Sequence, residues 1–178
     1  AIFAGPRVDI ITWQHIGLTN TMHIAAIRIH PSNPDVVYVA AQGAIHGPTA
    51  ERGIYKTTDG GRSWDRVLFV DDNTGCADLS MDMSNPRILY AGMWDHRRLP
   101  WLVRSGGPGS GLYKSTDGGN SWHKMSKGLP ANLGKVAIDV SRANPNRVYA
   151  NIESEDGLGG VYRSDDGGDS WSQTSKAR

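Results

Sequence analysis

The segment GIYKTTDGGRSW (53–64) decides the fold, because close copies of it recur as GLYKSTDGGNSW (111–122) and GVYRSDDGGDSW (160–171). Each copy follows a second repeated phrase, which is NPDVVYVA (33–40), NPRILYAG (85–92) or NPNRVYAN (144–151). All six tyrosines of the chain fall on two equivalent positions of these phrases. Self-similarity at a fixed period indicates a repeat architecture. We therefore expect three copies of one structural unit.

Each unit contains four segments with strand character. The first alternates apolar and polar residues, and the alternation is typical of a half-buried strand. An Asn-Pro turn follows, then a β-branched and aromatic strand, then the strand GIYKTT, GLYKST or GVYRSD, and a fourth strand that starts at the tryptophan. The apolar positions of the first strand are Ala25, Ile27 and Ile29, then Ala77, Leu79 and Met81, then Val136, Ile138 and Val140.

A period near 50 residues without a helical pattern is typical of four-stranded propeller blades. The expected fold is all-β: a partial β-propeller of three four-stranded antiparallel blades plus a spare N-terminal outer strand. We expect the blades at 23–70, 71–130 and 131–178. Residues 1–22 are interpreted as the tail of a preceding blade, with its fourth strand at about 10–18.

Three blades do not close a ring, since propellers typically have four to eight. An open arc leaves two blade faces bare, and water disfavours such apolar surface. The sequence begins at Ala1 without an initiator Met and without a signal-peptide pattern. The missing blades are therefore expected either in a longer chain, which we favour, or in a second copy.

The repeated Asp-Gly-Gly-x-Ser-Trp segment has a structural interpretation. A short carboxylate can accept hydrogen bonds from its own turn, glycines supply positive φ, and an indole fills space between sheets. One active site does not need three copies of an acid, whereas three blades need three turns. The residues assigned this role are Asp59, Gly61, Trp64, Asp117, Gly119, Trp122, Asp166, Gly168 and Trp171.

Composition excludes several function classes. The formal net charge is +1, so nothing favours nucleic acid as a partner. Cys76 is the only cysteine, so the chain forms no disulfide within itself. No apolar run approaches 18 residues, so we expect no membrane insertion. We expect no cofactor.

The connection between the second and third strands varies most, with tyrosine-to-tyrosine spacings of 17, 23 and 13 residues. Loops on a rigid scaffold commonly carry function. We call these connections the first (41–53), second (92–111) and third (151–160) inserts. Arginine forks bind carboxylates, and aromatic rings stack on ligands. The candidate ligand-binding residues are Trp94, Asp95, His96, Arg97, Arg98, Trp101, Arg104, Glu153 and Glu155. The alternative is that the two indoles pack the second insert onto a blade while its arginines stay solvated.

Catalytic and metal sites have weaker support. Glycoside hydrolysis needs two carboxyl groups about 5–10 Å apart. Asp95 with Glu153 or Glu155 is an available pair, but the sequence identifies no catalytic residue. His96 beside Asp95 lacks a second histidine at ligand spacing, so we expect no metal site.

The three repeated turns resemble the Asp-box, or bacterial neuraminidase repeat. With the Asn-Pro-x-x-x-Tyr phrase, residues 13–178 resemble sortilin-type and xyloglucanase-like propellers, and large exported bacterial proteins described as Asp-box glycosyl hydrolases. The resemblance implies the fold strongly and the activity weakly. Sialidases carry an Arg-x-Pro signature, and the nearest approach here, Gly5-Pro6-Arg7, has the wrong order.

We therefore expect a non-catalytic binding or scaffold module for a protein, peptide or glycan. The alternative is a fragment of a sialidase-like or xyloglucanase-like glycoside hydrolase acting on polysaccharide, and a third possibility is an assembly domain. The resemblance also implies an extracellular or periplasmic location.

Overall fold

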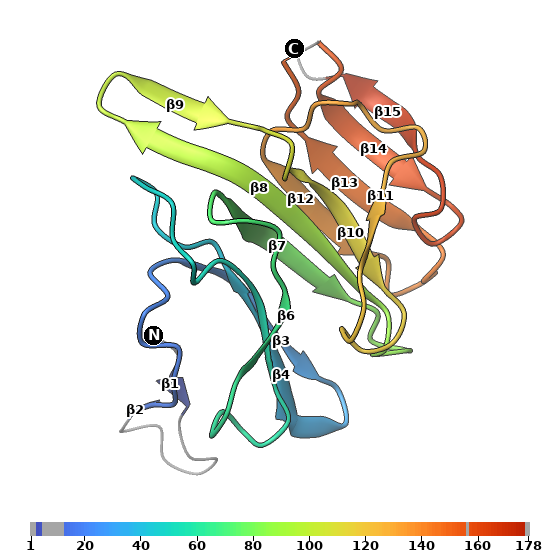
Figure 1. The fold of residues 1–178 in the computed structure, drawn as a ribbon. Coiled ribbons are helices and arrows are strands. Elements are labelled where there is room, and N and C mark those ends of the chain that lie inside the picture. Colours follow the sequence, from blue (N-terminus) through green and yellow to red (C-terminus); the bar gives the residue numbers. More distant parts are fainter. Residues whose placement is uncertain (1–2, 5–12, 156, 177–178) are drawn as a thin grey trace.

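The computed structural model describes residues 3–4, 13–155 and 157–176. In that part of the chain every regular element is a β-strand and every strand pair is antiparallel. Figure 1 shows three main sheets side by side, which are the expected blades. No helix among the described residues is long and apolar enough to cross a membrane.

The first and third blades are plain four-stranded meanders. The first has the order β3-β4-β5-β6, with bounds Ile24–His30, Asn33–Ala41, Gly53–Thr57 and Asp65–Leu68. The third has the order β12-β13-β14-β15, with bounds Val136–Val140, Val148–Ile152, Gly160–Ser164 and Ser172–Lys176.

The second blade carries an extra strand. Its order is β7-β8-β10-β11, with bounds Thr74–Met81, Leu89–Leu99, Gly111–Ser115 and His123–Met125. β8 continues past the blade and pairs with β9 (Leu102–Ser105). The second insert is thus largely a β-hairpin, which the sequence did not predict.

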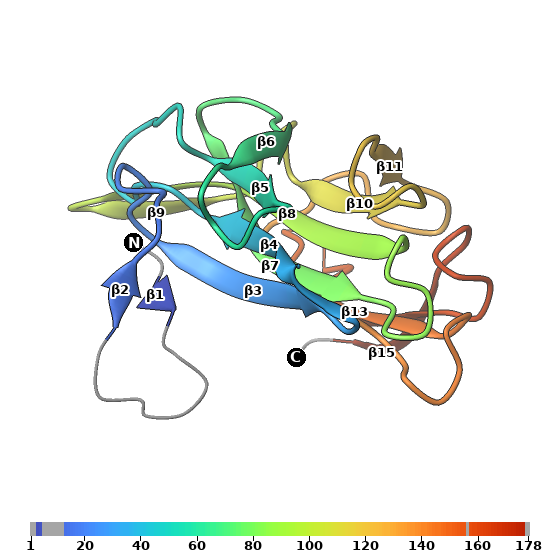
Figure 2. The same ribbon diagram turned by 90° about the horizontal axis from the view of Figure 1, so that it is seen from below.

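The N-terminal segment forms strand outside the three blades, as expected. β1 (Phe3–Ala4) and β2 (Gln14–His15) form a separate two-stranded sheet, which lies apart from the blades in Figure 2. Residues 10–12 of the expected fourth strand lie outside the described residues. Ile16 nevertheless contacts the first blade, because its carbonyl accepts a 3.0 Å hydrogen bond from Nε1 of Trp64.

The core lies between the blades. One cluster joins the first and second blades and includes Tyr38, Ile54 and Leu79; the other joins the second and third and includes Tyr90 and Ile138. The innermost strands β3, β7 and β12 lie side by side, and Asp78 Oδ2 accepts a 2.9 Å hydrogen bond from the Ile138 amide. Each sheet is therefore stabilised chiefly by its neighbour, as in a stacked repeat.

The first strand of the first blade forms as expected, as β3, but its apolar positions are not buried. Ile27 and Ile29 are 43% and 55% exposed, whereas the equivalent Leu79 and Ile138 are buried. Leu79 and Ile138 face the preceding blade, and no blade precedes β3 in the described residues. The fourth strands also begin one residue later than expected, after Trp64, Trp122 and Trp171.

Candidate functional site

The blade connections separate onto two faces. The Asp-Gly-Gly turns contact the Asn-Pro turns: the amides of Gly60, Gly118 and Gly167 donate to carbonyls of Asp35, Arg87 and Asn146. The inserts instead contact the links between blades, where Thr49 N donates to Asp72 O at 2.9 Å and Gly134 N to Glu153 O at 2.8 Å. The inserts and links therefore build one face of the molecule, which we call the insert face and which is the candidate ligand face.

Each Asp-Gly-Gly turn is closed by its own carboxylate. Asp117 Oδ1 accepts hydrogen bonds from the Ser121 amide at 2.9 Å and from Ser115 Oγ at 2.8 Å, while Oδ2 accepts from Ser121 Oγ at 2.6 Å. The same three bonds recur at Asp59 and at Asp166. The glycines have positive φ, for example 83° at Gly119. All the acid oxygens are thus used to hold the turn.

These bonds also fix the charge of the turns. Hydrogen bonds from Ser63 and Thr57 hold the pKa of Asp59 well below its usual range. The pKa of Asp117 is lowered by Ser121 and Ser115, and that of Asp166 by Ser164 and Ser170. Hydrogen bonds to the ionised form favour ionisation. These carboxylates therefore have no proton to give as general acids near neutral pH.

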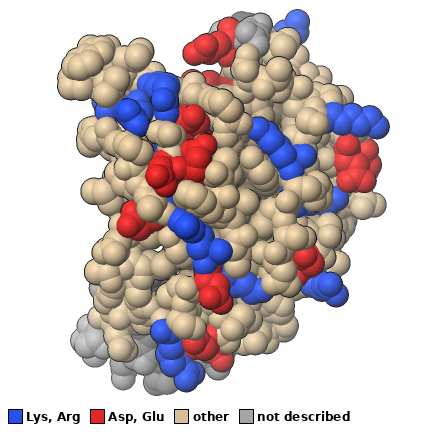
Figure 3. All heavy atoms as spheres, in the orientation of Figure 1, with Lys and Arg blue, Asp and Glu red and all other residues tan. Residues whose placement is uncertain are grey.

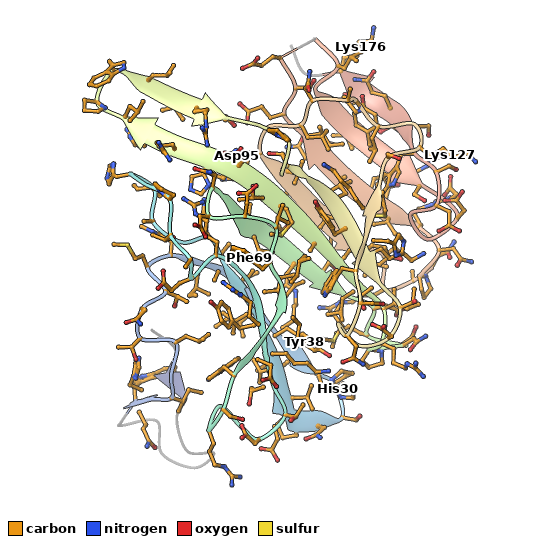
Figure 4. The ribbon with its side chains drawn as sticks, viewed as in Figure 1. His30, Tyr38, Phe69, Asp95, Lys127 and Lys176 are labelled. Carbon is orange, nitrogen blue, oxygen red and sulfur yellow. The ribbon has the colours of Figure 1, made fainter. Side chains whose placement is uncertain are left out.

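In the first two blades, the tyrosine of the second strand reaches into the next blade. Tyr38 Oη donates to Gly118 O at 2.8 Å, and Tyr90 Oη donates to Gly167 O at 2.9 Å. Figure 4 places Tyr38 on the side of the first blade that faces the second. The matching Tyr149 is 41% exposed. We call the Tyr38 and Tyr90 contacts the blade latches.

A cation accompanies each latch. Lys56 Nζ donates to the Gly118 carbonyl at 2.8 Å, and Lys114 Nζ lies 3.2 Å from Asp169 Oδ1 of the next blade. Arg163 instead pairs within its own blade, 3.0 Å from Asp165. Where a following blade is described, the positive charge at this position thus contacts the Asp-Gly-Gly turn of that blade.

The indoles vary in depth. Trp171 is buried, and Trp64 and Trp122 are half-buried. Nε1 of Trp122 and of Trp171 donates to the second glycine carbonyl of its own turn, at 3.1 Å in both. Trp64 donates to Ile16 instead.

The second insert projects from the insert face as the β8–β9 hairpin, at the upper left of Figure 1. Trp101 occupies its tip and is 80% exposed, and Leu102 and Val103 are 55% and 57% exposed. In Figure 3 this tip is uncharged, with basic side chains beside it. Trp101 is therefore presented to solvent and does not pack the insert onto a blade.

The base of the hairpin is rigidly held. Asp95, which Figure 4 shows on β8 where the hairpin leaves the blade, pairs with Arg104 of β9. Trp94 stacks on His96 with ring centroids 4.2 Å apart. Asp95 and His96 are 6% and 3% exposed. Arg97 donates to Asn73 Oδ1 at 2.9 Å, and the exposed Arg98 donates its amide to Ile45 O at 2.7 Å.

Arg52 is a buried cation whose role sequence reasoning missed. It is fully buried, and its guanidinium donates to the carbonyls of Ala44 and Gly47 and lies 3.2 Å from Nδ1 of His96. Burial lowers the pKa of Arg52, and burial likewise lowers the pKa of His96. His96 is therefore neutral beside this cation. The pattern Glu51-Arg52 looks like an exposed charged pair, so no local signal could have revealed the burial.

The third insert supplies two exposed carboxylates beyond the end of β13. Glu153 Oε2 accepts from Ser105 Oγ at 2.5 Å and from the Lys135 amide at 2.8 Å. Ser105 Oγ in turn accepts from Trp94 Nε1 at 2.9 Å. Glu153 thus ties the third blade to the hairpin, while Glu155 has no hydrogen-bond or ion-pair partner among the described residues.

A cavity of about 330 Å³ lies between the hairpin and the third blade. Its walls are Leu102–Gly107 on one side and Asn132–Gly134 with Glu153 and Glu155 on the other. Within the described residues, no group of three or more His, Cys, Asp or Glu side chains is arranged to hold a metal ion.

Comparison with known proteins agrees with this architecture. Over 133 residues, 74% of the chain, it is 27% identical to the vacuolar protein sorting/targeting protein 10 of Colletotrichum graminicola. The GH74 enzyme of Niastella koreensis superposes on 92% of the chain with a TM-score of 0.68 and 21% identity. The chain has the β-propeller fold of these proteins.

Two further structures share this propeller fold. The GH74 xyloglucanase of Xanthomonas campestris covers 93% of the chain with a TM-score of 0.59 and 19% identity. YCF48 bound to D1 peptide covers 86% with a TM-score of 0.51 and 17% identity. The propeller spans 8% of the curated relative, 25% and 26% of the two GH74 enzymes and 40% of YCF48. No protein-family model matches the chain.

Proposed function

We propose that the propeller is a binding module that recognises a protein or peptide through its insert face. The observation that carries the proposal is the β8–β9 hairpin, which is anchored at its base by the Asp95–Arg104 ion pair and presents Trp101 at 80% exposure. Exposed aromatic anchors on a rigid support are typical of binding hot spots. YCF48, a structural neighbour, is described as bound to D1 peptide.

Glycan binding is the second candidate ligand class, and glycoside hydrolysis is the alternative activity. The similarity in fold to GH74 enzymes favours hydrolysis. Against hydrolysis, Asp95 is buried in an ion pair with Arg104, and Glu153 is held by Ser105 and Lys135. Asp95 is therefore not free to act on a sugar, and one oxygen of Glu153 already accepts two hydrogen bonds.

The test is an array of immobilised 12-residue peptides probed with the wild-type chain and with Trp101→Ser. We expect a subset of peptides to retain the wild type at least fivefold more strongly than the variant. Trp13→Ser is the matched control, because Trp13 is 66% exposed and lies three residues before Ile16, which contacts the Asp-Gly-Gly turn on the opposite face of the first blade. Equal retention of all three proteins, or release of reducing ends from xyloglucan by the wild type, would overturn the proposal.

We also propose that further blades complete the ring and that the protein works outside the cytoplasm. Support for the first point is the pair of uncovered faces, with Ile27 and Ile29 on one and Tyr149 on the other. A second copy as the source of the blades would appear as a concentration-dependent dimer in sedimentation. Blades from the same polypeptide would leave the 178-residue chain monomeric. The location rests on resemblance to exported relatives, and immunolabelling of fractionated cells tests it.

A further inference from the structure

The hairpin strand β9 has one unpaired edge. Among the described strands β9 pairs only with β8, and Figure 1 shows its other side open. Gly106 N donates to Asp95 O at 2.8 Å. In an antiparallel pair of strands, hydrogen-bonded residue pairs alternate with non-hydrogen-bonded ones. Counting from this bond, the pairs of Arg97 with Arg104 and of Leu99 with Leu102 are hydrogen-bonded. The backbone groups of Val103 and Ser105 therefore point away from β8. An open edge of this kind is a template for another strand.

The cavity described above runs along this edge. Four consecutive residues of β9, Leu102 to Ser105, line it. Successive side chains of a strand point to opposite faces, so a cavity that touches all four lies at the strand's edge and not over one face. Its volume of about 330 Å³ is at the lower end of the range for ligand sites. It suits a short extended segment and not a folded domain.

The far wall of the cavity selects the charge of the occupant. It carries the carboxylates of Glu153 and Glu155. Arg104 also lines the cavity, but its charge is compensated by Asp95. Glu153 already accepts two hydrogen bonds, whereas Glu155 is exposed and has no described partner. A Lys or Arg side chain that crosses the cavity would reach these carboxylates.

We propose that the propeller binds an extended peptide as an added β-strand along β9, with a basic side chain of the peptide directed to Glu155. This mode is strand addition, in which main-chain bonds give affinity and pockets give specificity. The inference rests on the proposed function, since it names the partner chemistry of the same insert face.

Two fluorescein-labelled nine-residue peptides test the proposal by anisotropy. Both alternate Val and Thr, and they carry either Lys or Glu at the centre. We expect the Lys peptide to bind about tenfold more tightly, because two cavity carboxylates attract one and repel the other. Glu155→Gln should remove most of this preference. Asp72→Asn, an exposed carboxylate on a blade link of the same face, should leave it unchanged.

A second pair of variants tests the backbone contact. Val103→Pro removes an amide that faces away from β8, a position where an edge strand tolerates proline. We expect it to weaken the Lys peptide about tenfold. Val103→Ala keeps the amide and trims only the side chain, so it should weaken the Lys peptide much less than Val103→Pro does. Circular dichroism of both variants checks that the fold is retained.

The outcomes are separable from those of the peptide array. If array peptides depend on Trp101 but the Lys peptide ignores Val103→Pro, strand addition is wrong and peptide binding by the hairpin tip stands. If neither designed peptide binds at millimolar concentration, strand addition is also wrong. If nothing in the array depends on Trp101, the proposed function fails as well.

Discussion

The blade latch at Tyr90 allows a quantitative test of how the arc is held together. Tyr90 is 1% exposed and donates to Gly167 O at 2.9 Å, across the boundary between the second and third blades. Tyr90→Phe keeps the ring and removes this donor. The lost bond and the unsatisfied carbonyl together should cost about 1–2 kcal/mol of unfolding free energy.

The repeat supplies its own controls. Tyr149 is the equivalent residue of the third blade but is 41% exposed, so Tyr149→Phe should cost less than about 0.5 kcal/mol. Tyr38→Phe should fall between the two, because Lys56 Nζ also donates to Gly118 O and keeps that carbonyl bonded. The expected order of destabilisation is Tyr90, then Tyr38, then Tyr149.

Urea unfolding followed by tryptophan fluorescence measures the order. With a slope of about 2 kcal/mol per molar urea, Tyr90→Phe should lower the midpoint by about 0.5–1 M. Burial raises the pKa of Tyr90 to about 12, so its contribution is fully present below the unfolded pKa near 10 and is lost as pH rises through 12. The wild type should therefore lose stability over this interval, and Tyr90→Phe should lose less. Equal midpoints for Tyr90→Phe and Tyr149→Phe would refute the latch.

Three further predictions concern the turns and the base of the hairpin. Gly168→Ala should cost about 1–2 kcal/mol more than Gly157→Ala, because both have positive φ but only at Gly168 would the new methyl lie 2.7 Å from a buried sulfur. Thermal unfolding measures the difference. Since burial lowers the pKa of His96, stability should fall as pH drops below about 6.5, and His96→Asn should flatten that dependence in urea titrations from pH 7 to 5. Arg52→Met leaves two backbone carbonyls without their donor and should speed cleavage of the first insert by proteinase K, read by mass spectrometry, while the exposed Arg62→Met should not.

Each of these has a contrary outcome. Equal melting temperatures for the two glycine variants would show that the space around Gly168 is not tight. A flat stability curve between pH 7 and 5 in the wild type would mean that His96 is not buried in its neutral form. Unchanged cleavage of the Arg52 variant would show that the first insert is held by other contacts.

The fold could be predicted because it depends on local sequence patterns that recur in each blade. The Asp-Gly-Gly turn is closed by a carboxylate only two and four residues from its partners, as at Asp117. Positive φ at Gly118 and Gly119 is a property of single residues. Alternation in Val136–Val140 predicted the buried set Val136, Ile138 and Val140. Where alternation failed, at Ile27 and Ile29, burial depended on a neighbouring sheet that is not among the described blades.

The candidate ligand face could be predicted only in outline. Insert length picked out the second insert, and the candidate binding residues in it remain predictions until binding is measured. That the insert is a hairpin depends on β8 continuing past its blade and on Pro100-Trp101 turning the chain back. Glu153 joins the hairpin through Ser105, 48 residues away in sequence, and no short-range pattern reports such a pairing.

By itself the sequence determined the strands of the blades, their turns and the number of blades, since the physics of a turn or of a two-residue period acts over a few residues. Only the tertiary structure decided which faces are covered, which charges are buried and where a strand edge lies open. Arg52 and Trp101 show that burial does not follow residue type, because the charged residue is fully buried and the indole is 80% exposed. Burial is set by what packs against a residue. Arg52 contacts His96, 44 residues away, as well as Ala44 and Gly47 of its own insert, whereas Trp101 lies at the tip of a hairpin that leaves its blade.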